Sequence, residues 1–164
     1  MVIIRIIILL VFPLIFSCAG GHSFPWKPFF FDGTNFSPAA DNSSKTIWLR
    51  SGHFPSTTEP TAGSASSDRL PPGTGAVAGI CYIQTTGGKI AARTSYTPYP
   101  DEQITFKSKK EGASVTRTDK DGYFIEYLTA GEYELFCRGV RTEFKIKQGE
   151  TTLVPIRGGK RMAD

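Results

Sequence analysis

The stretch Thr116–Phe136, TRTDKDGYFIEYLTAGEYELF, shows the fold more clearly than any other part of the chain. Apolar and polar residues alternate on both sides of Ala130, which is the period of β-strands. Just before them, Asp119, Asp121 and Gly122 stand in the order D-x-D-G, which also occurs in calcium-binding loops. The stretch is therefore either part of a metal site or a turn that joins two strands.

The calcium interpretation requires a register that these residues do not provide. A helix-flanked calcium loop needs oxygen ligands at alternate positions, then a glycine, and a glutamate at its end. If Asp119 opens the loop, Gly122 comes too early; if Gly122 takes the glycine position, the loop opens on the cation Arg117 and ends on Leu128. A turn explains the same residues, because Asp accepts hydrogen bonds from nearby backbone N–H groups and glycine adopts positive φ. We therefore interpret Asp119, Asp121 and Gly122 as a turn motif and predict no metal or other cofactor.

The second half of the chain consists of short alternating runs divided by turn signals, which is typical of an antiparallel sandwich. The longest connection, Thr85 to Glu102, contains TPYP and two glycines, which argue against regular pairing. We predict an all-β, seven-stranded antiparallel Ig-like or prealbumin-like β-sandwich over residues 76–158, without helices. The predicted strands lie near Val77 to Gln84, Gln103 to Ser108, Ser114 to Thr118, Tyr123 to Leu128, Gly131 to Arg138, Thr142 to Lys147 and Thr151 to Ile156.

Four short motifs occur in a fixed order in this half. They are a G-x-V strand at Gly79 to Cys81, with Cys in the aliphatic place; T-D-x-x-G-x-F at Thr118, Asp119, Gly122 and Phe124; L-x-x-G-x-Y at Leu128, Gly131 and Tyr133; and a glycine with a V-x-I strand at Gly149, Val154 and Ile156. This series closely resembles the carboxypeptidase regulatory-like domain, a transthyretin-like (prealbumin-like) β-sandwich. The resemblance covers residues 76–158, about half the chain, and implies a non-catalytic accessory module.

Residues 1–18 are predicted to be a signal peptide. Arg5 is followed by an apolar run from Ile6 to Phe16, which is shorter than the roughly 20 residues that a membrane-spanning helix needs. Leu14 to Cys18 resembles the lipobox of bacterial lipoproteins, which implies that Cys18 becomes the lipidated first residue of the mature chain. Phe16 departs from the pattern, because a smaller residue is usual there. An ordinary cleaved signal and an uncleaved anchor are the alternatives, and all three export the chain.

Residues 19–75 show neither the period of a strand nor that of a helix over any length. Ser, Thr, Pro and Gly dominate their second part, so we predict a flexible, disordered tether. Trp26 and Phe29 to Phe31 either pack on the domain, enter lipid headgroups beside the anchor or contact a partner. Ile47 to Leu49 is the place where a short strand is expected. Residues 159–164 are predicted to be a basic tail.

Cys81 and Cys137 form an even pair once Cys18 is set aside. In an oxidising compartment such a pair favours a disulfide, while two buried free thiols are the alternative. Alternation places Cys81 on the same strand face as Val77, and Cys137 on the same face as Leu135, so both cysteines point toward the core. We treat the pair as a disulfide candidate and not as a catalytic site.

The sequence shows no set of residues in the pattern of a known catalytic site. The two histidines, His22 and His53, both fall in the predicted tether, so no Ser-His-Asp or Cys-His arrangement is expected inside the domain. A Lys to Asn or Asp cross-link between the first and last strands is not expected either, because Val77 to Gln84 has no lysine. The net charge of +4 contains no block of five like charges, which argues against a nucleic-acid partner. The sequence therefore predicts a protein that is not an enzyme.

The order of the parts predicts an exported, lipid-anchored β-sandwich that acts as a binding or scaffolding module at the cell envelope. Its expected partners are the membrane, through the anchor, and an envelope protein or glycan on the periplasmic or extracellular side. Alternatives are a subunit of an assembled surface structure or adhesin, and a small hydrolase. The surface proposed for binding includes Tyr96 and Tyr99 in the long loop and the lysine cluster Lys107, Lys109 and Lys110.

Lipidation of Cys18 is testable by metabolic labelling with a fatty-acid analogue. We expect the wild-type chain to take up the label, and Cys18→Ala to leave an unprocessed or soluble form that takes up none. A wild-type protein without label, whose mature N-terminus lies elsewhere than Cys18, would contradict the prediction.

Overall fold

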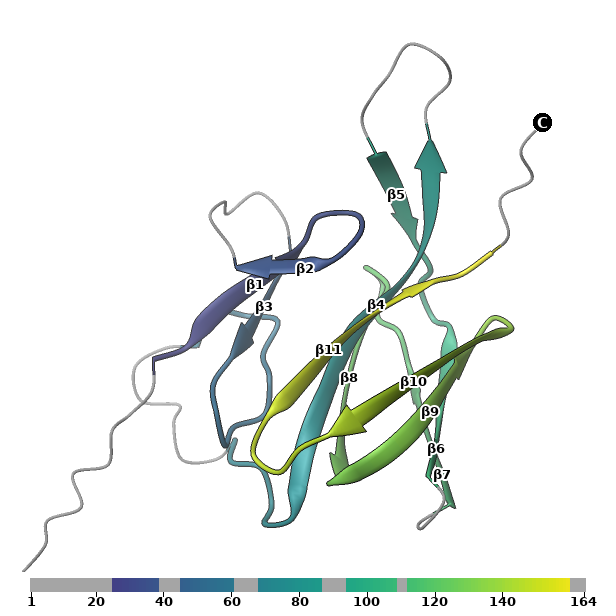
Figure 1. Cartoon of the computed structure of the whole chain (residues 1–164). Helices are drawn as coiled ribbons and strands as arrows, with labels where there is room; N and C mark the ends of the chain where they lie inside the picture. The colour runs from purple at the N-terminus through teal and green to yellow at the C-terminus, as the bar shows by residue number, and fades with distance from the viewer. Residues whose placement is uncertain (1–24, 39–44, 61–67, 87–93, 109–111, 160–164) are drawn as a thin grey trace, which may run out of the picture.

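The chain is all-β throughout the part that the computed structural model describes, residues 25–38, 45–60, 68–86, 94–108 and 112–159. Within these ranges no helix has the length and apolar character needed to cross a membrane. The predicted signal peptide with Cys18, and most of the predicted basic tail, lie outside them. The described strands (Figure 1) are β1 (Lys27–Phe31), β2 (Phe36–Pro38), β3 (Thr46–Leu49), β4 (Thr74–Thr86), β5 (Thr94–Pro98), β6 (Gln103–Ser108), β7 (Gly112–Arg117), β8 (Tyr123–Thr129), β9 (Gly131–Cys137), β10 (Val140–Ile146) and β11 (Thr151–Arg157).

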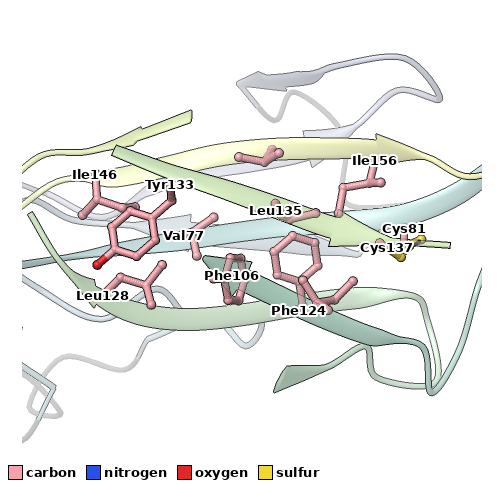
Figure 2. Packing of buried hydrophobic residues seen from close by; sticks show 12 residues of the cluster. Val77, Cys81, Phe106, Phe124, Leu128, Tyr133, Leu135, Cys137, Ile146 and Ile156 are labelled. Carbon is pink, nitrogen blue, oxygen red and sulfur yellow. Dashed lines mark hydrogen bonds between the residues drawn. The ribbon is translucent and has the colours of Figure 1, made fainter. Parts of the chain in front are cut away.

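Two sheets pack face to face as a β-sandwich. One has the strand order β10-β9-β6-β7; in the other, β11 pairs with β4, whose opposite edge pairs first with β8 and then with β5. Apolar side chains from both sheets meet between them, as Figure 2 shows. Phe106 and Leu135 from the first sheet and Val77 and Ile156 from the second are at most 1% exposed, which places the core between the sheets.

Each predicted strand coincides with one of the observed strands β4 and β6 to β11, with ends that differ by a few residues. Two parts of the prediction are wrong. Thr94–Pro98 in the supposed loop forms β5, which pairs with the end of β4. The sandwich is not wholly antiparallel, because β11 runs parallel to β4 from Thr151↔Ala76 to Arg157↔Tyr82. Alternation within a strand tells which residues share a face and carries no information on the direction of a partner far away in sequence.

Strand β4 is buried on both faces. Every residue from Thr74 to Tyr82 is buried, so the strand lies inside the molecule and not at its surface. Val77 and Cys81 face the sandwich core. Ala78, Ile80 and Tyr82 face the other way, where they pack with Phe31 and Ile47 of a third sheet. The molecule therefore has three layers, with β4 in the middle one.

The third sheet is formed by the N-terminal strands in the order β2-β1-β3, so the prediction of a flexible tether over residues 19–75 is wrong for this part. Asp32 explains the β1–β2 hairpin, because its side chain accepts hydrogen bonds of 2.8 Å from the N–H groups of Thr34 and Asn35. The expected strand at Ile47 to Leu49 is confirmed as β3. Of the three alternatives for the aromatic cluster, Phe31 follows the first, since its ring packs on the domain.

The contact of the third sheet with β4 is aromatic. The Phe31 ring lies 4.6 Å from the ring of Tyr82 and 4.9 Å from that of Tyr96, measured between centroids. Such pairs add to the free energy gained by burying a phenyl ring. The N-terminal strands are therefore part of the folded unit.

Replacing Phe31 with alanine should lower the free energy of unfolding by roughly 3 kcal/mol or more, because a ring that is 2% exposed is removed from a packed site. Urea denaturation measures this, with Phe30→Ala as the control, since Phe30 is half-buried on the other face of β1 and should cost less. An unchanged urea midpoint in Phe31→Ala would mean that the N-terminal sheet does not stabilise the sandwich.

Candidate functional site

Asp119, Asp121 and Gly122 lie in the connection between β7 and β8, where the backbone turns. The Asp119 carboxylate accepts hydrogen bonds of 2.9 Å from the N–H groups of Asp121 and Tyr123. Gly122 has φ of +77°, and a Cβ atom there would lie 2.7 Å from Pro98 Cβ and 2.9 Å from the Cys81 carbonyl oxygen. Glycine is thus needed both for the backbone conformation and for the close approach of β4.

The two aspartates hold the ammonium group of Lys45, which precedes β3. Lys45 Nζ donates a hydrogen bond to Asp119 and one of 2.9 Å to Asp121, and it also lies 5.2 Å from the centre of the Tyr123 ring. The lysine is 74 residues away from Asp119 in sequence, so no local pattern could have indicated the contact. This ion pair ties the third sheet to the turn.

The ion pair between Lys45 and Asp121 favours the charged form of both groups. The hydrogen bond from Lys45 holds the pKa of Asp121 below its usual value, so the stabilisation is present above pH 3.8 and is lost as pH falls through the lower folded pKa. Burial opposes the charge on Lys45, but the bonds to Asp119 and Asp121 outweigh it and raise the lysine pKa above 10.5. That contribution is lost only at higher pH.

Cys81 on β4 and Cys137 on β9 meet at one end of the sandwich core (Figure 2). Both are buried thiols, with 2.9 Å between their Sγ atoms. The hydrogen bond between the sulfur atoms raises the pKa of Cys81, and burial acts in the same direction. The same hydrogen bond lowers the pKa of Cys137, against the effect of its burial.

Arg138 covers the same end of the sandwich. It forms a two-residue turn with Gly139 between β9 and β10, at φ of +48°, a conformation that costs energy in a residue other than glycine. Its guanidinium group pairs with Glu102 and lies 4.1 Å from the centre of the Tyr99 ring. Tyr99, which the sequence suggested as an exposed binding residue, is instead half-buried against the core.

His53 is buried beside the third sheet. In sequence it is distant from both Cys81 and Cys137. Its Nδ1 lies 3.0 Å from the Ser51 carbonyl oxygen, and the edge of its ring packs on Trp26, with 5.8 Å between centroids. Its Nε2 has no hydrogen-bond partner in the described residues. His22 lies outside the described ranges. Nor does the described part of the chain bring three His, Cys, Asp or Glu together as a metal site.

An open groove of about 480 Å³ lies over β6, β9 and β10. Glu134 and Glu143 stand directly opposite each other on β9 and β10, and Lys107 stands opposite Glu134 on β6. Like charges in directly opposed positions repel, and Arg141 bridges the two glutamates in compensation. The residues that line the groove are Lys107, Ser108, Glu132, Tyr133, Glu134, Glu143, Phe144 and Lys145.

Of the residues that line the groove, only Lys107 was proposed from the sequence as part of a binding surface. The other two members of the proposed lysine cluster, Lys109 and Lys110, lie outside the described ranges. Tyr96 is not a free surface residue, because its ring packs against Phe31 and Tyr82. The sequence signal that indicates the groove is Glu132 and Glu134, which alternate along β9 and therefore share one face of the strand.

The sequence matches no family model, and no curated protein matches it. The resemblance to the carboxypeptidase regulatory-like domain therefore stays a prediction that rests on the motifs themselves.

Replacing Gly122 with valine should lower the free energy of unfolding by roughly 2 kcal/mol or more, because a branched side chain resists positive φ and would collide with Pro98. Asp121→Asn should have a much smaller effect, since the side chain keeps an oxygen for Lys45. Thermal melts of these variants and the wild type, each with chelator and with calcium, provide the measurement. A calcium-dependent rise in the wild-type melting temperature that Asp121→Asn removes would establish a metal site instead of a turn.

For a chain isolated from an oxidising compartment, we expect Cys81 and Cys137 to be joined by a disulfide. Both sulfur atoms should then resist maleimide labelling after denaturation until a reductant is added. Reduction should lower the free energy of unfolding by roughly 4 kcal/mol, because the bond closes a loop with a sequence separation of 56. Two thiols that react without reductant would show that the pair stays free.

Proposed function

We propose that the chain is an exported, lipid-anchored, non-enzymatic β-sandwich that binds a partner at the cell envelope through the groove over β6, β9 and β10. Within this proposal the sandwich is a carboxypeptidase regulatory-like module, as the four sequence motifs suggest. The opposed glutamates Glu134 and Glu143 are the observation that carries it. Arg141 and Lys107 offset the repulsion between them, so charges of both signs gather on an outer face where the core does not need them.

The groove suits a polar partner that presents a positive group. Glu132 lies opposite Lys145, next to the pair formed by Glu134 and Glu143, so three carboxylates and two ammonium groups alternate across the two strands and β6. Tyr133 and Phe144, which alternate with these charged residues along β9 and β10, also line the groove. A protein surface or a charged glycan presents groups of this kind.

The position of the third sheet supports an anchored orientation. Pro25 and Lys27, at the start of the described N-terminal part, lie beside Glu150 and Thr151 at the start of β11, which is the end opposite the projecting β4–β5 hairpin (Figure 1). Cys18 precedes Pro25 by 7 residues, which span at most about 25 Å when fully extended. A lipid on Cys18 would therefore hold this end near the membrane, and the folded body would supply the distance that a flexible tether was expected to supply.

Comparative capture from native membranes tests the binding proposal. Wild-type chain and Glu143→Lys are cross-linked mildly in cells, purified and compared for partners recovered in stoichiometric amounts. The Glu143 side chain is 75% exposed, so the substitution should leave the fold intact while it places a cation in the groove. We expect at least about a tenfold loss of the captured partner.

Glu150→Lys is the matched control, because Glu150 is 57% exposed, is also ion-paired and lies outside the groove. It should capture the partner as the wild type does. Equal capture by Glu143→Lys would reject the groove as the binding surface. Turnover of a substrate that one point substitution abolishes would reject the non-enzymatic function and favour the hydrolase alternative.

A further inference from the structure

We propose that two copies of this chain associate through the free edge of β7, which pairs with its own counterpart in antiparallel orientation about a two-fold axis at Val115. The two four-stranded sheets then continue into one another through adjacent β7 strands. The proposal concerns a surface other than the groove, and it holds whether or not Cys18 carries a lipid.

Strand β7 is an unprotected sheet edge. It is the last strand in the order β10-β9-β6-β7, so one row of its backbone N–H and C=O groups has no partner strand in the described residues. Proteins usually blunt such edges with proline, with charge or with very short strands. Strand β7 has six residues, no proline, and a single charge at its last residue, Arg117.

The other edge strands in the described residues carry these protective features: β3 has only four residues, and β10 carries the charges of Arg141, Glu143 and Lys145. Prolines occupy β2, β5 and β11 as Pro38, Pro98 and Pro155. Strand β8, which runs beside β7 on the same side of the sandwich, has Glu126 at its centre on the face shared with Phe124. The contrast indicates that the edge of β7 lacks protective features because a partner strand pairs with it.

An exposed apolar side chain lies at the middle of this edge. Val115 is 55% exposed and stands opposite Thr105 on the outer face of its sheet. A shallow groove of about 230 Å³ separates the first residues of β7 from the last residues of β8, so β8 does not close the edge. An isolated exposed valine needs no explanation by itself; here it sits on an unpaired strand.

The sequence of β7 fits itself in this register. With Val115 opposite its counterpart, two β-branched side chains pair on the outer face, and Ser114 meets Thr116 on the inner face, where hydroxyl pairs are favourable. Arg117 lies opposite Ala113, so no like charges face each other. An isologous interface requires this self-complementarity, and a second copy is therefore the occupant that β7 fits best.

Sedimentation of the full chain in mild detergent over a range of concentrations tests the proposal. The wild type should form a dimer, and Val115→Lys should weaken association at least about tenfold, because two lysines would then face each other across the axis. Tyr127→Lys is the matched control, since Tyr127 is 54% exposed but lies on the other sheet. It should dimerise as the wild type does, and thermal melts should show that both variants remain folded.

Cysteine cross-linking in native membranes tests the register. Val115→Cys should give a disulfide-linked homodimer on mild oxidation, because the two Cβ atoms would lie about 5 Å apart, whereas the wild type and Tyr127→Cys should not. A wild type that stays monomeric, equal association of Val115→Lys and Tyr127→Lys, or a Val115→Cys adduct with a different protein would each overturn the proposal.

Discussion

The burial of β4 on both faces is the constraint on which the rest of the structure depends. Strand β4 begins with small residues, and two of its glycines let neighbouring segments come close. A Cβ atom on Gly79 would lie 2.1 Å from the Val154 carbonyl oxygen and 2.4 Å from the Phe124 ring. One on Gly75 would lie 2.2 Å from the Lys147 carbonyl oxygen. The parallel pairing with β11 and the packing of Phe124 from β8 therefore require glycine at these positions.

The sandwich was predictable because its information is local. Alternation and turn residues fix each strand from β6 to β11, and the D-x-D-G stretch fixes the turn before β8. The inward faces that hold Cys81 and Cys137 follow from the same period and are confirmed. The function of the groove was not predictable in this way, because opposed charges such as Glu134 and Glu143 come together only through strand register.

The third sheet was missed although two signals for it were present. The continuous apolar run from Ala76 to Ile83 is typical of a strand covered on both sides, but only one face was assigned a partner. The sequence Asp32-Gly33 between aromatic runs is a hairpin signal, and it lies in a segment that was assigned to the tether because it shows no sustained period. The contact of Lys45 with the aspartate turn left no sequence signal, because ion pairs between distant segments have no period.

A urea titration read by two probes tests most directly whether the three layers form one unit. Both tryptophans of the chain, Trp26 and Trp48, lie in the N-terminal part, so their fluorescence reports on the third sheet alone. Far-ultraviolet circular dichroism reports on all strands. Because one face of β4 packs against that sheet, the two unfolding curves should coincide in midpoint and slope. A fluorescence transition that is complete at lower urea, before the dichroism changes, would contradict a shared core.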